Sequence, residues 1–129
     1  MTLTPKYITT IAVLIGVSFL MAASPNEADW KQVQDAINRG LPKTAIEKLD
    51  PIIKQATENN NHDEAIKAIA MKISLEGEIQ GEKAEEKITR MRAAIEKAPA
   101  EMKPVMEAIL ANWFWNYLKA VALLELREV

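Results

Sequence analysis

The sequence predicts an all-α fold of about five helices that pack as antiparallel hairpins after an N-terminal signal helix. Apolar residues recur at helical spacing in five segments, and no stretch alternates apolar and polar residues with the β-branched enrichment of a strand. Glycine, asparagine and proline mark the ends of these segments. Because short turns join neighbouring helices, each must run antiparallel to the next, which gives a stack of hairpins or an irregular bundle.

The five predicted helices span approximately residues 27–39, 42–58, 62–80, 82–97 and 104 to near the C-terminus. Gly40 lies just past the first segment, where glycine commonly ends a helix, and Pro42 occupies the tolerated first position of the second. Asn59, Asn60 and Asn61 form the next turn. Pro99 ends the fourth segment. These signals predict helix boundaries on both sides of each turn.

The third segment is predicted to be the centre of the domain, because it is apolar on two sides. One face carries Ile66, Ile69, Ala70 and Ile73, and nearly the opposite face carries Ala68, Met71, Leu75 and Ile79. A helix that is apolar on both sides is packed on both sides. The fourth segment, in contrast, has a single apolar stripe, and its charged side, which includes Glu85, Arg90 and Arg92, is expected to face solvent.

Composition places the chain among ordinary globular domains, since 49% of its 129 residues are hydrophobic and 26% are charged. The formal net charge is −2 and no basic stripe is present, so nucleic acid is not an expected partner. The sequence contains no cysteine, which excludes disulfides, thiolate metal sites and cysteine nucleophiles.

The N-terminus has the pattern of a secretory signal peptide. Lys6 precedes a short run, residues 8–21, that is apolar apart from two threonines and a serine, and Ala22 and Ala23 follow. This order predicts a signal peptide over residues 1–23, a helical domain over residues 24–129, and a periplasmic or secreted protein. The alternative is an uncleaved membrane anchor, although a spanning helix needs about 20 apolar residues.

Catalytic chemistry is not expected from this sequence. His62 is the only histidine, and it opens a predicted helix beside Asp63 and Glu64, where it is interpreted as part of the capping region. No carboxylate lies on an apolar face that would raise its pKa for acid–base work. We therefore predict a protein that is not an enzyme and needs no metal or cofactor. A carboxylate pair assembled from different helices stays open as an alternative.

The most unusual stretch is the aromatic run at residues 113–117. Each helical residue turns about 100° from the last, so Trp115 must point nearly opposite to Trp113. With Trp113 facing inward, Trp115 is left toward solvent. Either two layers of the domain cover both sides of the helix, or its outer side binds a partner, where tryptophan and tyrosine are enriched. The candidate partner-binding residues are Trp115, Phe114, Tyr117 and Leu118.

Two family resemblances follow from particular blocks of sequence. The segment Gly40–Leu49, with a glycine turn followed by alanine and large aliphatics, resembles one tetratricopeptide hairpin, whereas at least three such repeats normally form a stable solenoid. Five blocks, taken in their order along the chain, resemble the helical region that follows the signal peptide in some very large bacterial alpha-2-macroglobulin-like proteins. These blocks are Trp30–Val33, Gly40–Ala45, Ala65–Ile69, Leu75–Gly81 and Ala111–Tyr117.

The second resemblance implies a module rather than an activity. Members of that family trap proteases through downstream β-sandwich domains, a bait region and, in many, a cysteine–glutamine thioester. This chain contains no cysteine for a thioester, so no functional residue carries over. The chain is either a stand-alone relative or a truncated copy of the long form. We expect a non-enzymatic, exported module that binds a protein or a second copy through its C-terminal aromatic helix. The alternative is a membrane-anchored structural envelope protein.

Overall fold

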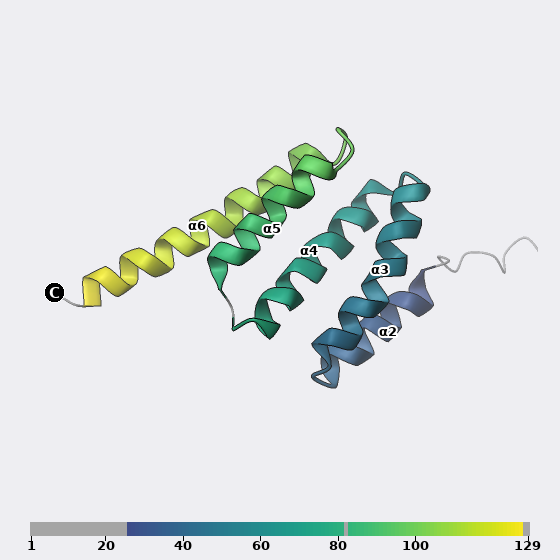
Figure 1. Ribbon diagram of the computed structural model, residues 1–129, viewed down its shortest axis with the longest axis horizontal. Helices are drawn as coiled ribbons and strands as arrows, with labels where there is room; N and C mark the ends of the chain where they lie inside the picture. Colours follow the sequence, from purple (N-terminus) through teal and green to yellow (C-terminus); the bar gives the residue numbers. More distant parts are fainter. Residues whose placement is uncertain (1–25, 82, 128–129) are drawn as a thin grey trace, which may run out of the picture.

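The all-α prediction is confirmed by a computed structural model, which describes residues 26–81 and 83–127 (Figure 1). Within these residues there are five helices and no strand. The helices are α2 (Glu27–Asn38), α3 (Pro42–Glu58), α4 (His62–Ile79), α5 (Ala84–Lys97) and α6 (Lys103–Arg127). The bounds of α3 agree with the sequence-based prediction, and those of α2, α4 and α6 agree to within one residue. α5 begins at Ala84, later than the predicted position 82.

The turns that follow α2 and α3 share one geometry. In the first, Leu41 donates its backbone N–H to the carbonyl of Ala36, and Gly40 has a φ of 67°. In the second, Asn61 donates to Ala56, and Asn60 has a φ of 55°. This is a Schellman-type helix end, which needs a left-handed residue that glycine adopts freely and asparagine tolerates. The two turns reverse the chain, so that α2, α3 and α4 run antiparallel in order.

The helices form a stack in which each one packs against the helices before and after it in the sequence (Figure 1). Two clusters of buried side chains hold this stack together. The first joins α2, α3 and α4 around Val33, Leu49, Ile52 and Leu75. The second joins the end of α3 and one face of α4 to α5 and α6 around Ile66, Ile73, Met91 and Met106. α4 contributes side chains to both clusters and therefore lies at the centre of the core.

The two-sided packing predicted for α4 is confirmed. Ile66 and Ile73 belong to the second cluster, whereas Ala68 and Leu75 belong to the first. Ile69 and Met71 are partly buried, one against each cluster. Ile79, which the helical spacing places on an inner face, is instead 41% exposed, because it is the last residue of the helix. The rest of α4 separates the two halves of the core.

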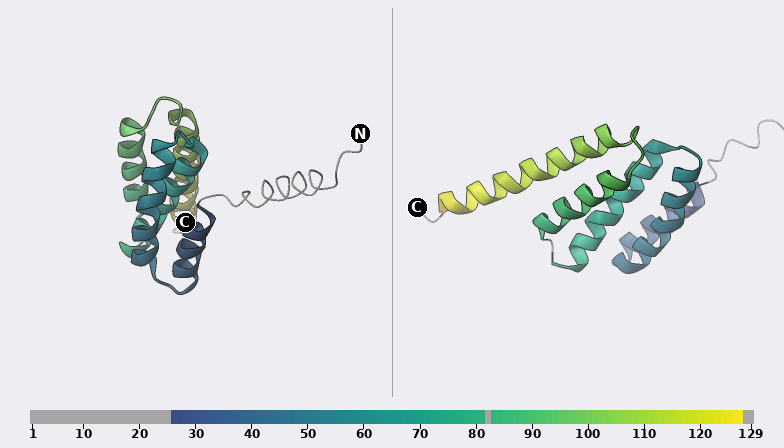
Figure 2. Two further views of the ribbon diagram at one scale, coloured as in Figure 1. Left: turned by 90° about the vertical axis from the view of Figure 1, so that its right-hand side faces the viewer. Right: turned by 45° about the horizontal axis from the view of Figure 1, so that its top comes forward.

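The last helix is much longer than the helix it packs against. α6 has 25 residues and α5 has 14, and their antiparallel contact brings Tyr117 beside Glu85, near the start of α5. The rest of α6 extends past α5 and away from the stack (Figures 1 and 2). Leu124 continues the inward stripe of α6 but is 65% exposed, since no helix of the described chain lies opposite it.

The predicted signal peptide, residues 1–23, lies outside the described residues, so the structure does not test it. Among the described helices, none combines the length and apolar character required to span a bilayer.

Candidate functional site

The outer side of α6, facing away from α5, carries a continuous stripe of apolar residues. Its members follow one another at intervals of three or four residues, which keeps them on one side of a helix. They are Ala108, Ala111, Trp115, Leu118, Ala122 and Leu126, and we call them the α6 stripe. Trp115 is 60%, Leu118 47% and Leu126 73% exposed. Three large apolar side chains in one exposed row make this face the candidate site for contact with a partner.

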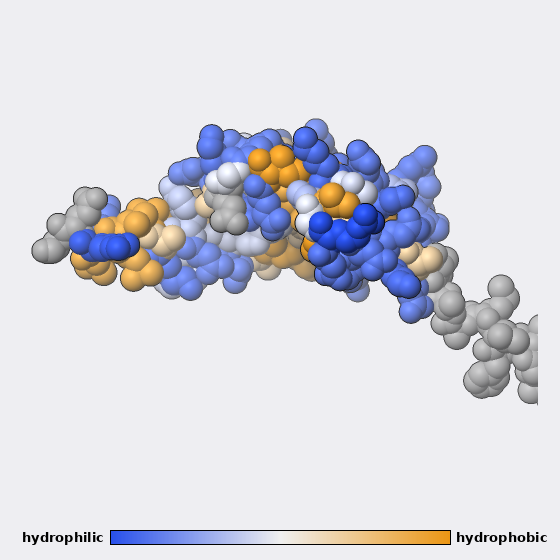
Figure 3. Space-filling model, turned by 90° about the horizontal axis from the view of Figure 1, so that it is seen from below, coloured by the Kyte–Doolittle hydropathy of each residue, from blue (hydrophilic) through white to orange (hydrophobic). Residues whose placement is uncertain are grey.

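A groove of about 380 Å³ borders one side of the α6 stripe. Leu110, Ala111, Phe114, Trp115 and Leu118 give it an apolar wall, and the charged side chains of Arg92 and Glu107 complete the lining. Arg92 comes from α5, so the groove lies where the two helices meet. The hydropathy surface shows apolar residues gathered on the projecting end of α6 (Figure 3). Exposed apolar side chains therefore occur both at the groove, where Leu118 lies, and at the helix end, where Leu126 lies.

The aromatic side chains of residues 113–117 point to different sides of α6, as their helical spacing predicts. Trp113 is partly buried against the second cluster, and Trp115 points to solvent with the Lys119 ammonium 5.9 Å from its ring centroid. Phe114 is 39% exposed and lies beside Tyr117 in an edge-to-face arrangement, with ring centroids 6.4 Å apart. Of the four candidate partner-binding residues, Trp115, Phe114 and Leu118 thus present free apolar surface.

Tyr117 differs from the other three candidates because its polar group is already engaged within the fold. Its hydroxyl donates a 2.9 Å hydrogen bond to Oε1 of Glu85 on α5. Tyr117 therefore fixes α6 against the start of α5, and its helical position faces inward. This bond also raises the pKa of Tyr117 above its ordinary value, because ionisation would lose the bond and place a phenolate beside a carboxylate.

Replacing Glu85 with glutamine should lower the pKa of Tyr117 toward the ordinary tyrosine value of about 10. The shift stabilises the protonated form in the folded state, so its contribution to stability is complete below the unfolded pKa. That contribution is lost as the pH rises through the folded pKa. Phenolate absorbance in a Tyr7→Phe background, where Tyr117 is the remaining tyrosine, measures the titration.

The matched control is Glu86→Gln, since Glu86 lies next to Glu85 and pairs with Lys83 at 3.8 Å instead. This change should leave the titration of Tyr117 where it is in the parent chain. An equal pKa in the parent and the Glu85→Gln variant would mean that the hydroxyl does not bind Glu85 in solution.

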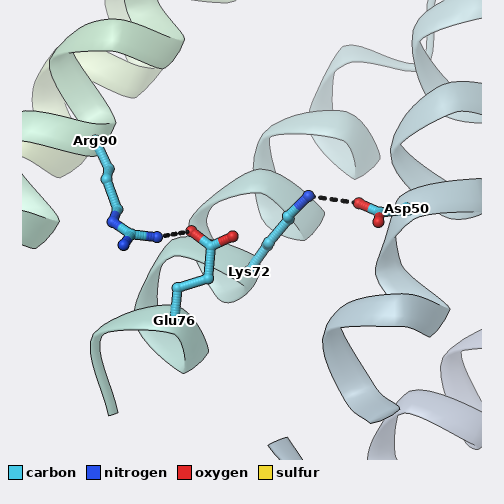
Figure 4. A network of polar contacts seen from close by, with 4 residues as sticks. All are labelled: Asp50, Lys72, Glu76 and Arg90. Atoms are coloured by element: carbon cyan, nitrogen blue, oxygen red, sulfur yellow. Dashed lines mark hydrogen bonds and ion pairs between the residues drawn. The ribbon is translucent and has the colours of Figure 1, made fainter. Parts of the chain in front are cut away.

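A second groove, of about 510 Å³, lies on the other side of the stack between α3, α4 and α5. Two ion pairs cross this region (Figure 4). Lys72 of α4 donates to Asp50 of α3 at 2.6 Å, and Arg90 of α5 donates to Glu76 of α4. Arg90, expected on a solvated face, is thus used to join two helices. Each carboxylate is thus paired with a cation of a neighbouring helix.

Glu64 of α4 is a further polar residue whose role is structural and was not foreseen from sequence. Its carboxylate accepts 2.8 Å hydrogen bonds from the Asn26 amide, the Trp30 indole and the Asn61 amide. The Lys67 ammonium lies 4.1 Å from the centroid of the Trp30 ring. These contacts hold the start of α2 against α4. Asn26 occupies the N-cap position of α2 but its side chain makes no capping bond.

Within residues 26–81 and 83–127, no group of three or more histidine, cysteine or acidic side chains could hold a metal ion. His62 is the first residue of α4, as predicted. Comparison of the chain with protein-family models, curated proteins and solved structures finds no match.

Proposed function

We propose that this chain is a non-enzymatic helical module that binds protein through the outer face of α6. The observation that carries the proposal is the α6 stripe, which places Trp115, Leu118 and Leu126 in solvent on a helix that extends past its own neighbour. Aromatic side chains bordered by apolar groups are the usual anchors of protein interfaces. In this proposal, the stacked hairpins form a rigid scaffold from which the end of α6 projects into solvent.

Three features favour a protein partner at this face. The stripe is straight and continuous, which suits the side of another helix better than a compact small molecule. The adjoining groove is open along its length and mostly apolar, with two charged residues in its lining, Arg92 and Glu107. In addition, Trp113 and Tyr117 anchor the inner side of the same helix, so the outer side chains are presented on a fixed scaffold.

The cellular setting is a separate proposal that rests on the sequence. The Lys6, apolar-run and Ala22–Ala23 order favours export and cleavage after Ala23, and the ordered sequence blocks favour a relationship to the N-terminal region of bacterial alpha-2-macroglobulin-like proteins. Intact mass of the exported chain tests the first, because a full-length product in the membrane fraction favours the anchored alternative. Macroglobulin-like domains encoded directly downstream would support the second.

Hydroxyl-radical footprinting of the three tryptophans tests the docking proposal. Side chains that become covered by a partner are oxidised more slowly, so Trp115 should lose reactivity when the chain is concentrated or placed in an envelope extract. Trp30 is the internal control, because it is bound within the fold by Glu64 and Lys67. It should react equally under all conditions.

The pattern of protection separates the outcomes. Protection of Trp115 in the concentrated chain alone indicates a second copy, and protection only in the extract indicates another protein. Unchanged oxidation of Trp115 in both would contradict the proposed function.

A further inference from the structure

We infer that the partner of the α6 stripe is the same stripe of a second copy, packed antiparallel about a two-fold axis near Leu118. This inference rests on the proposed function and names its partner. Three observations lead to it: the order of large and small side chains along the stripe, the charges beside it, and the length of α6 that stands free.

The size pattern of the stripe is self-complementary in the antiparallel direction. With the two-fold axis beside Leu118, Trp115 lies opposite Ala122 of the second copy, and Leu126 lies opposite Ala111. On each side of the axis a large residue then meets a small one, and the two Leu118 side chains meet at the axis itself. In a parallel pair, Trp115 would meet Trp115 and Ala122 would meet Ala122. The two Trp115 rings would then clash, and a gap would remain between the two Ala122 side chains.

Charge supports the same register. In an antiparallel pair related by a two-fold axis, each flank of one helix faces the same flank of the other. Glu125 lies on the flank that bears the groove, and the register brings Glu125 of the second copy to the level of Ala111 and Phe114. Arg92 lines the groove at that level, and neither Arg92 nor Glu125 forms an ion pair among residues 26–81 and 83–127. The two-fold symmetry gives the interface two such pairs of Arg92 and Glu125, one at each end.

The free length of α6 is sufficient for such a contact. At 1.5 Å per residue, the stripe from Ala108 to Leu126 extends about 27 Å. Its outer side is not covered by any other described helix, so a second copy can approach without displacing α5 (Figures 1 and 2). Lys119 lies on the flank opposite Glu125, where its ammonium is near the Trp115 ring and free to turn into solvent. A symmetric contact of this kind closes as a dimer and leaves no stripe unpaired.

Single cysteines test the direction of pairing, because the natural chain has none. In the full chain under mild oxidation, Leu118→Cys should give a disulfide-linked dimer, since the two positions meet near the axis. Ala111→Cys is the matched control on the same stripe. The register separates its two copies by 15 helical steps, about 22 Å, so it should stay monomeric. Equal crosslinking at both positions would indicate a parallel pair, and crosslinking at neither would exclude this interface.

Charge reversal tests the register without altering the apolar contact. Sedimentation of the full chain should show dimer dissociation constants about tenfold higher for Arg92→Glu and for Glu125→Arg, and a return toward the parent value when both changes are combined. Glu101→Arg, an exposed reversal before α6, is the control and should dimerise like the parent. No recovery in the double variant contradicts the register. A parent chain that stays monomeric at high concentration overturns the inference, while protection of Trp115 in extract would still support docking to another protein.

Discussion

Replacing Ile73 with aspartate should unfold the domain at room temperature. Ile73 is 5% exposed and packs on α4 against the second cluster, which joins α4 to α5 and α6. The second cluster consists of apolar side chains, so the variant places a carboxylate among them in place of an apolar side chain. We expect a loss of about 4–5 kcal/mol, comparable to the whole stability of a small domain. Far-ultraviolet circular dichroism during thermal unfolding measures it.

Ile79→Asp is the matched control, because it makes the same chemical change on the same helix at a side chain that is 41% exposed. It should cost at most about 1 kcal/mol. Ile69→Asp should fall between the two, since Ile69 is only partly buried and the new carboxylate can reach water more easily. A cooperative melt for Ile73→Asp at the parent temperature would show that α4 is not packed on this side.

Trp113→Ala should be the second most damaging change, with a loss of about 3 kcal/mol. The Trp113 ring packs on the second cluster together with Ile109 and Leu110, and these contacts fix α6 on α5. The expected value lies at the low end for a tryptophan because the ring is partly exposed. Thermal or denaturant unfolding gives the difference in free energy.

Trp113→Phe is the control for Trp113→Ala, since phenylalanine fills much of the same space in an apolar setting. It should recover at least half of the lost stability. Equal unfolding free energies for Trp113→Ala and the parent would mean that α6 is not held on the stack through this residue.

Much of the fold could be predicted from sequence because local signals and packing agree in this chain. α3 begins at Pro42 and ends at Glu58 both in the prediction and in the structure. A proline favours the first turn of a helix, and the asparagines after Glu58 form the next turn. The two faces of α4 were predicted from spacing alone, because burial on both sides leaves a distinct apolar pattern. The antiparallel packing of consecutive helices was predicted from the short turns that join them.

Contacts between polar side chains on different helices could not be predicted in the same way. Arg90 and Glu76 lie on faces that look solvated in their own helices, and they pair only after α4 and α5 are placed side by side. Glu64 likewise gains three donors from residues that are distant in sequence or in a neighbouring turn. Helical periodicity describes which side of a helix is apolar, and it contains no information on which charged residues meet across a gap.

The candidate site was predictable in part, because the outward direction of Trp115 follows from that of Trp113. What helical spacing could not supply was the placement of α5 against α6, which leaves the end of the 25-residue α6 without a neighbour among the described helices. Helical spacing places Tyr117 on the inner side with Trp113, but the hydrogen bond of Tyr117 to Glu85 is a contact between two helices, which spacing cannot supply. The site therefore shifts from the whole aromatic run to Trp115, Phe114, Leu118 and the exposed residues that follow.

The most direct test of α6 as a docking surface is sedimentation of Trp115→Ala beside the parent chain, with thermal melts of both. Trp115 is 60% exposed, so its removal should change the unfolding free energy by less than about 0.5 kcal/mol. As a central anchor it should contribute about 2 kcal/mol or more to association, which raises the dissociation constant roughly thirtyfold. A variant with unaltered stability and weakened association is the predicted result. A variant that loses as much stability as Trp113→Ala and associates like the parent would contradict the account, because Trp115 would then belong to the core.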